Sequence, residues 1–158
     1  MAMRNVQRLS GIINDLLDLS KIEAGKMDFN FVQTNINTVI DYVKSALSEV
    51  AKSKGLTLIT DETENIPSVN ADPQRLEQVL TNLVSNAIKF TPENKTIKIS
   101  SKIVNTETMR INEYFKDSIK LAQGEYIQVC VEDEGIGIAE SDMLHAFDKF
   151  AQIENSLS

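Results

Sequence analysis

Four polar residues recur at helical spacing in the middle of the chain: Gln78, Asn82, Asn86 and Lys89. In a helix that turns by about 100° per residue, they share one narrow stripe. Two asparagines one turn apart are unusual there, because asparagine is a poor helix former. Amide oxygens suit a Mg²⁺ ion shared with phosphates, and a lysine adds a point charge for phosphate. An ordinary solvated helix face shows the same pattern, so the stripe alone favours neither explanation.

A second motif is the run Asp133-Glu134-Gly135-Ile136-Gly137. Paired glycines let the backbone turn sharply and let a planar ligand approach closely. A carboxylate just before them can accept a hydrogen bond from an exocyclic amine such as that of adenine. Taken alone, so short a motif is more often a simple turn beside an acid. It is not a dinucleotide fingerprint, because Glu140 stands in place of the third glycine, and the chain contains no GxxxxGK[ST] phosphate loop.

The remaining reactive residues are predicted to be structural. Cys130 and His145 are the only cysteine and the only histidine. With no second thiol or imidazole to support redox or metal chemistry, we expect a packed thiol and a structural histidine. Glu132 and Glu134 have no second acidic cluster at a fitting distance and are predicted to be solvated.

The polar stripe requires a helix from Pro73 to about Phe90. Asp72 is a strong N-cap, proline suits the first helical position, and Thr91-Pro92 ends the helix. The apolar residues expected opposite the stripe are Leu76, Val79, Leu80, Leu83 and Ala87. The glycine motif requires a strand before it, which the alternation over 127–131 predicts.

Further elements follow from periodicity. Helices are predicted over 3–24 and from Asn35 or Asn37 to Gly55, and a last one from about residue 141. The apolar face expected on the second of these consists of Val39, Ile40, Val43, Leu47 and Val50. Strands are predicted over 27–32, weakly, and over 56–60 and 97–103. The predicted fold class is α+β, a mixed sheet covered by helices on one face, with a long helix before it.

Composition narrows the function further. The 158 residues are 42% hydrophobic and 25% charged, with a net charge of -7. Disorder is excluded, and nucleic acid or an anionic membrane is not an expected partner. A single cysteine fits a cytoplasmic setting, and no apolar run approaches the ~20 residues of a membrane span.

Taken together, the motifs resemble those of sensor histidine kinases. The segment 72–92 is similar to their N box, 131–138 to their first glycine box, and 145–150 to the phenylalanine box that precedes the ATP lid. Residues 16–26 resemble the second helix of the dimerisation domain. The four motifs occur in the family's order and cover almost the whole chain.

The resemblance implies a Bergerat-type ATP-binding fold and a role for each matching residue. ATP and Mg²⁺ are the implied cofactors. Asn82 and Asn86 would hold Mg²⁺ and the phosphates, Lys89 would contact phosphate, and Gln78 would polarise the acceptor histidine. The residues implied around the adenine and its lid are Phe90, Asp133, Gly135, Gly137, Phe147 and Phe150.

The resemblance also predicts what the chain contains. Residues 1–27 correspond to the second dimerisation helix, without the first helix and its acceptor histidine, and 28–158 to an ATP-binding domain that ends before the second glycine box. The stretch from Thr96 to Tyr126 is longer than the usual hairpin, which suggests an insertion. A chain of this kind is not expected to autophosphorylate. Its parent would be a cytoplasmic or membrane-anchored kinase.

Three functions remain open on the sequence. The first is the ATP-binding part of a kinase that phosphorylates a histidine, forms a homodimer through its N-terminal helix and serves a response-regulator receiver domain. The second is a non-catalytic dimerisation or interaction module. The third is an ATPase of the same superfamily with no histidine substrate.

Overall fold

The chain divides into two compact units, residues 1–31 and 32–158. The structure, a computed structural model, describes residues 13, 16–107, 121–139 and 142–143. In the first unit, residues 16–23 are helical, and the chain leaves this helix at Gly25, whose φ of 63° favours glycine. Much of the predicted helix over 3–24 therefore lies outside the described residues. The side chains of Ile13, Leu16, Leu17 and Ile22 are about half exposed.

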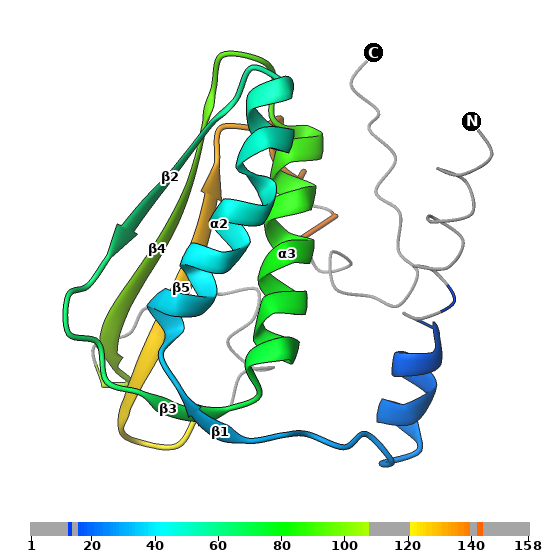
Figure 1. Cartoon of the computed structure of the whole chain (residues 1–158), viewed down its shortest axis with the longest axis vertical. Coiled ribbons are helices and arrows are strands. Elements are labelled where there is room, and N and C mark those ends of the chain that lie inside the picture. Colours follow the sequence, from blue (N-terminus) through cyan, green and yellow to red (C-terminus); the bar gives the residue numbers. More distant parts are fainter. Residues whose placement is uncertain (1–12, 14–15, 108–120, 140–141, 144–158) are drawn as a thin grey trace. The chain divides into compact units, whose positions relative to one another are not determined.

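A three-stranded mixed sheet forms the frame of the second unit (Figure 1). Its order is β2 (Thr57–Glu62), β4 (Thr96–Asn105) and β5 (Glu125–Asp133). β2 and β4 run parallel, whereas β4 and β5 run antiparallel. The mixed sheet expected from the sequence is thereby confirmed.

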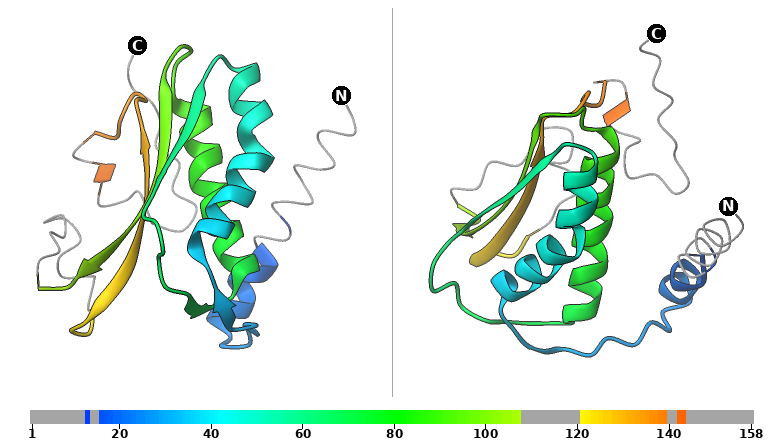
Figure 2. Two further views of the ribbon diagram at one scale, coloured as in Figure 1. Left: turned by 60° about the vertical axis from the view of Figure 1, so that its left-hand side comes forward. Right: turned by 45° about the horizontal axis from the view of Figure 1, so that its top comes forward.

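Two helices, α2 (Ile36–Ser53) and α3 (Pro73–Phe90), cover the same face of this sheet (Figure 2). Alternation along β4 turns Ile97 and Ile99 toward the helices, and both are fully buried. The residues of the core that are fully buried with them are Ile40 and Val43 of α2 and Val84 of α3. The helices therefore hold their places by apolar burial, which leaves the other side of α3 accessible.

Both helices begin where the sequence predicts. The side chain of Asn35 accepts a hydrogen bond from the N–H of Asn37, at 2.9 Å. Asp72 Oδ1 accepts from the N–H groups of Gln74 and Arg75, at 3.0 and 3.3 Å. These bonds satisfy backbone donors that a helix cannot pair internally.

The predicted apolar faces were partly wrong. Val79 and Leu83 of α3 are 55% and 44% exposed, and Val50 of α2 is 51% exposed. Val84 and Ile88 of α3 are buried instead. The apolar residues of α3 spread over more of its circumference than the sheet and α2 can cover, so tertiary contacts select only one arc.

A two-stranded sheet at the start of the unit also differs from expectation. β1 (Val32–Thr34) pairs antiparallel with β3 (Val69–Ala71). The strand predicted over 27–32 was therefore wrong except for its last residue. Phe29 and Phe31 stack on each other, with ring centroids 5.6 Å apart. β3 was not predicted, because a strand of three residues is too short to show an alternation of apolar and polar residues.

The range from Thr96 to Tyr126, interpreted as an insertion, consists largely of β4 and the start of β5. Residues 108–120 in its middle, and nearly all of the helix predicted from residue 141, lie outside the described residues. None of the described helices is long and apolar enough to cross a bilayer.

Candidate functional site

The polar stripe lies on the side of α3 that is not packed against the core. Asn82, Asn86 and Lys89 are exposed, and Gln78 is half-buried. Within the described residues, no hydrogen bond engages the amide of Asn82 or Asn86. Gln78 differs, because its Oε1 accepts a hydrogen bond from Arg75 Nη1 at 2.9 Å. Two amides one turn apart are thus presented to solvent without partners in the part of the chain that the structure describes, and asparagine is a residue type that helix interiors disfavour.

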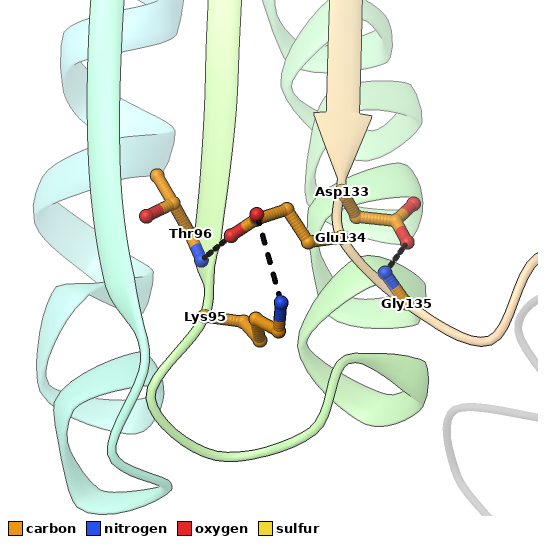
Figure 3. Close-up of polar contacts among 5 residues, drawn as sticks. All are labelled: Lys95, Thr96, Asp133, Glu134 and Gly135. Atoms are coloured by element: carbon orange, nitrogen blue, oxygen red, sulfur yellow. Dashed lines mark hydrogen bonds and ion pairs between the residues drawn. The ribbon is translucent and has the colours of Figure 1, made fainter.

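The glycine motif forms a tight turn directly after β5 (Figure 3). Asp133 Oδ1 accepts a hydrogen bond from the N–H of Gly135, at 2.8 Å. The second carboxylate oxygen points away from Gly135 (Figure 3). Gly137 has a φ of 73°, in the left-handed region where a side chain is strained. The turn therefore fixes the orientation of Asp133 and leaves one of its oxygens for a ligand.

The two motifs meet at the C-terminal end of α3. A methyl group added to Gly135 would lie 3.0 Å from the backbone oxygen of Phe90 and closer still to Asp133 Oδ1. Only a glycine allows the turn to approach the helix end so closely. The predicted residues of the glycine motif are thus brought against the predicted residues of the N-box helix, which are far away in the sequence.

Lys89 and Phe90 are in contact with each other at this junction. The ammonium group of Lys89 lies 4.5 Å from the centroid of the Phe90 ring. Phe90 is 39% exposed, so one aromatic face and one cation are available next to the turn after β5. A cation over an aromatic face is worth about 0.5–1 kcal/mol at an exposed site, which is weak enough for a phosphate to displace.

Glu134 has a role that the sequence did not indicate. It was expected to be solvated, and its side chain is indeed 53% exposed. Yet its Oε2 accepts a hydrogen bond from the N–H of Thr96 at 2.7 Å, and its Oε1 lies 3.8 Å from Lys95 Nζ (Figure 3). Glu134 therefore ties the turn after β5 to the start of β4.

Lys54 was missed as well, and no sequence signal points to it. Its Nζ donates hydrogen bonds to the backbone oxygens of Ile88, Lys89 and Thr91. A lysine whose hydrogen bonds go to main-chain atoms of a distant segment produces no recognisable sequence motif.

The phenylalanines predicted near the lid, Phe147 and Phe150, lie outside the described residues, as does His145. Cys130 lies within β5 and is half-buried. Burial raises the pKa of its thiol, and the charge of nearby Glu132 raises it further. A thiol held in its neutral form fits the packed role expected for it.

A groove of about 460 Å³ lies away from these residues. It is lined mainly by apolar side chains, among them Ile36, Val69, Leu76, Ile103 and Ile127. It contains none of the predicted site residues. We therefore place the candidate site at the end of α3 and not in this groove.

The site offers amide oxygens as ligands for a cation, without an acidic cluster. The described residues contain no group of three or more His, Cys, Asp or Glu that could hold a metal. Mg²⁺ commonly keeps several waters and takes few protein ligands when phosphates complete its shell. Asn82 and Asn86 fit such a shared ion.

The chain matches known proteins in sequence and in fold. Residues 71–158 match the family described as "Histidine kinase-, DNA gyrase B-, and HSP90-like ATPase". The chain is 36% identical over 156 residues to the sensor histidine kinase GacS of Pseudomonas protegens, a match that covers 98% of this chain and 15% of GacS. Its structure is similar to that of the Acinetobacter baumannii histidine kinase AdeS, with a TM-score of 0.69 and 28% identity over 91% of this chain and 62% of AdeS.

A third similar structure is that of the histidine kinase ThkA in complex with the response regulator protein TrrA. The TM-score is 0.51, with 30% identity over 63% of this chain and 28% of ThkA. The resemblance to sensor histidine kinases and the Bergerat-type fold are confirmed, while the chain spans only about 15% of the length of relatives such as GacS. The matched range holds α3, β4, β5 and the turn that meets the end of α3, and the chain belongs to the family of histidine kinase-, DNA gyrase B- and HSP90-like ATPases.

Proposed function

We propose that this chain is the ATP-binding catalytic part of a sensor histidine kinase, with its nucleotide at the junction of α3 and the turn after β5. The observation that carries the proposal is the approach of Gly135 to the backbone oxygen of Phe90. It brings together a carboxylate suited to adenine and a helix face suited to phosphates. Neither the polar stripe of α3 nor the glycine motif indicates a nucleotide site by itself. Their contact places both motifs in a single site.

The phosphate side consists of Asn82, Asn86 and Lys89. The two amides, which are unengaged within the described residues, would hold Mg²⁺, and Mg²⁺ when bound neutralises phosphate charge. Lys89 leaves the ring of Phe90 and offers its ammonium group to a phosphate oxygen. Phosphoryl transfer depends on positioning and charge stabilisation more than on covalent help from the protein, and this set of residues supplies both.

The adenine side consists of Phe90, Asp133 and the two glycines. The free oxygen of Asp133 accepts a hydrogen bond from the exocyclic amine, while Gly135 holds the other oxygen in place. The half-exposed ring of Phe90 packs near the base. Gly137, with its positive φ, lets the chain pass the base without a side chain. Phe147 and Phe150 would anchor the lid.

The phosphoryl acceptor would be a histidine other than His145, because His145 belongs to the segment that resembles the phenylalanine box. Gln78 would polarise that histidine and is oriented by its hydrogen bond from Arg75. The acceptor helix would belong to a dimer in which residues 16–26 take part. A response-regulator receiver domain would then take the phosphoryl group, in the cytoplasm.

A calorimetric titration with Mg·ADP tests the nucleotide site. We expect saturable binding by the chain and at least a tenfold weaker affinity for Asp133→Asn, because an amide in place of the carboxylate presents N–H groups to the amine. Glu132→Gln is a matched control with the same chemical change one residue away, and it should bind like the unaltered chain.

Absence of binding by a folded chain would contradict the proposal and favour an interaction module. Steady ATP hydrolysis without any histidine acceptor would favour an ATPase that has no histidine substrate. Acid-labile phosphate on this chain after incubation with Mg·ATP would contradict its expected inability to autophosphorylate.

A further inference from the structure

The C-terminal end of α3 needs hydrogen-bond donors from elsewhere in the chain. The last four carbonyl groups of any helix lack partners within the helix. The N–H of Thr91, in an extended conformation, donates to the oxygen of Ala87 at 3.0 Å. The carbonyl groups of the next residues then point out of the helix end, where the helix dipole places partial negative charge.

Lys54 supplies these donors from the turn that follows α2. Its Nζ donates to the oxygens of Ile88 at 2.5 Å, Lys89 at 2.7 Å and Thr91 at 3.0 Å. All three donors of one ammonium group are thus used on one helix end. The side chain is half-buried, so its charge is less screened than that of a surface lysine.

A second contact holds the same turn to the segment after α3. The N–H of Asn94 donates to the oxygen of Gly55 at 2.9 Å. Gly55 has a φ of 71°, and this brings the chain round after Lys54. The turn at 54–55 and the segment at 88–94 are therefore joined at several main-chain positions, although α2 and α3 are separate elements.

The bonded carbonyls belong to the part of α3 that carries the nucleotide residues. Lys89 and Phe90 follow directly, and Asn86 lies one turn earlier. The oxygen of Phe90, between the carbonyls that Lys54 binds, is the one that Gly135 approaches. A shift or fraying of this helix end would move both the phosphate-binding residues and the surface that receives the turn after β5.

We propose that Lys54 is a positioning residue for the nucleotide site, acting through the end of α3 without touching the nucleotide. The inference rests on the proposed function, since it presumes a nucleotide at this junction. The ammonium group fixes the carbonyls of Ile88, Lys89 and Thr91. It thereby keeps Lys89 and Phe90 in a constant position relative to Asp133, on the other side of the contact with Gly135.

The test compares Lys54→Met with Lys44→Met by Mg·ADP calorimetry, well below the melting temperature of each variant. Lys44 is a matched control, because it is also a half-buried lysine and lies on α2 itself, but its Nζ donates to Thr60 Oγ1 on β2 at 2.9 Å. We expect Lys54→Met to weaken Mg·ADP binding about tenfold and Lys54→Arg to restore most of it, as is usual for residues that orient binding groups. Lys44→Met should leave the affinity within about twofold, because it does not reach α3.

Unchanged affinity in Lys54→Met would overturn the inference and leave the proposed function standing. Equal weakening in Lys44→Met would also overturn it, because the effect would then be one of general stability. A wild-type chain that binds no Mg·ADP would overturn both proposals together. If Lys54→Met does not fold, Lys54→Gln takes its place: its shorter, uncharged side chain has only two donors for the three carbonyls, so weaker binding is expected, and unchanged binding by that variant would overturn the inference.

A second readout does not depend on nucleotide. The backbone amide of Gly135 should change its NMR chemical shift in Lys54→Met and keep it in Lys44→Met. If the Gly135 signal does not move when the Lys54 side chain is lost, Lys54 does not influence the turn after β5, and the inference is contradicted.

Discussion

At the scale of single residues, the site depends on position 135 being a glycine, which has no side chain. The turn after β5 and the end of α3 touch where a β-carbon would meet the backbone oxygen of Phe90 at 3.0 Å. A carbonyl oxygen in a helix end cannot rotate aside as a flexible side chain can. The hydrogen bond from the Gly135 amide to Asp133 adds to this constraint, because any shift of the turn also moves the carboxylate.

Gly135→Ala should therefore separate the two motifs. We expect a loss of about 1–3 kcal/mol in the free energy of unfolding, the usual range for overpacking, and weaker Mg·ADP binding. Urea denaturation and calorimetry measure the two effects. Gly137→Asn is the control, because position 137 has open space and a positive φ that asparagine tolerates. A smaller loss of stability in Gly135→Ala than in Gly137→Asn would be evidence against close packing at Gly135.

The site residues that are predictable from the sequence are those whose side chains have distinctive chemistry. The asparagines of α3 and the Asp133 motif stand out by type and spacing. Glu134 and Lys54 do not, because both form their hydrogen bonds with backbone groups of segments distant in sequence, and any accessible N–H or C=O would serve. Residues that orient a site through main-chain bonds are visible only once the fold brings those segments together.

At the scale of elements, α3 is the part of the molecule that combines a core face with a site face. Its start was predictable because capping is local: Asp72 needs only the two N–H groups that follow it. Its buried arc was not, since Val79 and Leu83 are as apolar as Val84 and Ile88. The choice between them is made by α2 and the sheet, which a helical period does not describe.

The two caps offer a matched pair of substitutions. Asp72→Ala removes a buried carboxylate that accepts two N–H bonds, and Asn35→Ala removes an exposed amide oxygen that accepts one. We expect losses in unfolding free energy of about 1–2 kcal/mol for Asp72→Ala and about 0.5–1 kcal/mol for Asn35→Ala. Chemical denaturation measures both. A larger loss for Asn35→Ala than for Asp72→Ala would mean that the free-energy cost of burying the Asp72 carboxylate exceeds the stabilisation from its two hydrogen bonds.

At the scale of the whole molecule, the mixed sheet with helices on one face was predictable from the order of elements. The parallel pairing of β2 with β4 was not, because alternation reveals that a segment is a strand and does not reveal its neighbour. β1 and β3 were too short to predict. The helical period over 13–22 is readable in the same way, but a period does not identify the surface that covers the apolar residues.

The half-exposed apolar residues of the first unit lead us to predict that this helix associates with another copy of the chain. Ile13, Leu16 and Leu17 recur at helical spacing, so a second copy could bury them. Leu16→Gln should lower the fraction of dimer measured by analytical ultracentrifugation, because it removes apolar area from that seam. Asp18→Asn, on the other side of the helix from these three residues, should leave it unchanged. A chain that stays monomeric at high concentration would contradict dimerisation through this helix.

The parallel β2–β4 pair also sets an order of events during synthesis. Thr57 pairs with Thr96, so a ribosome releases β2 well before the strand that will bond to it. At a synthesis rate of about 5–20 residues per second, β2 is released roughly two to eight seconds before β4. Over the same interval α3 emerges beside α2, and Val84 becomes available to pack with Ile40 and Val43. The helical layer is thus the first part of this core that a nascent chain can build, and β4 arrives to complete a sheet on a surface already formed.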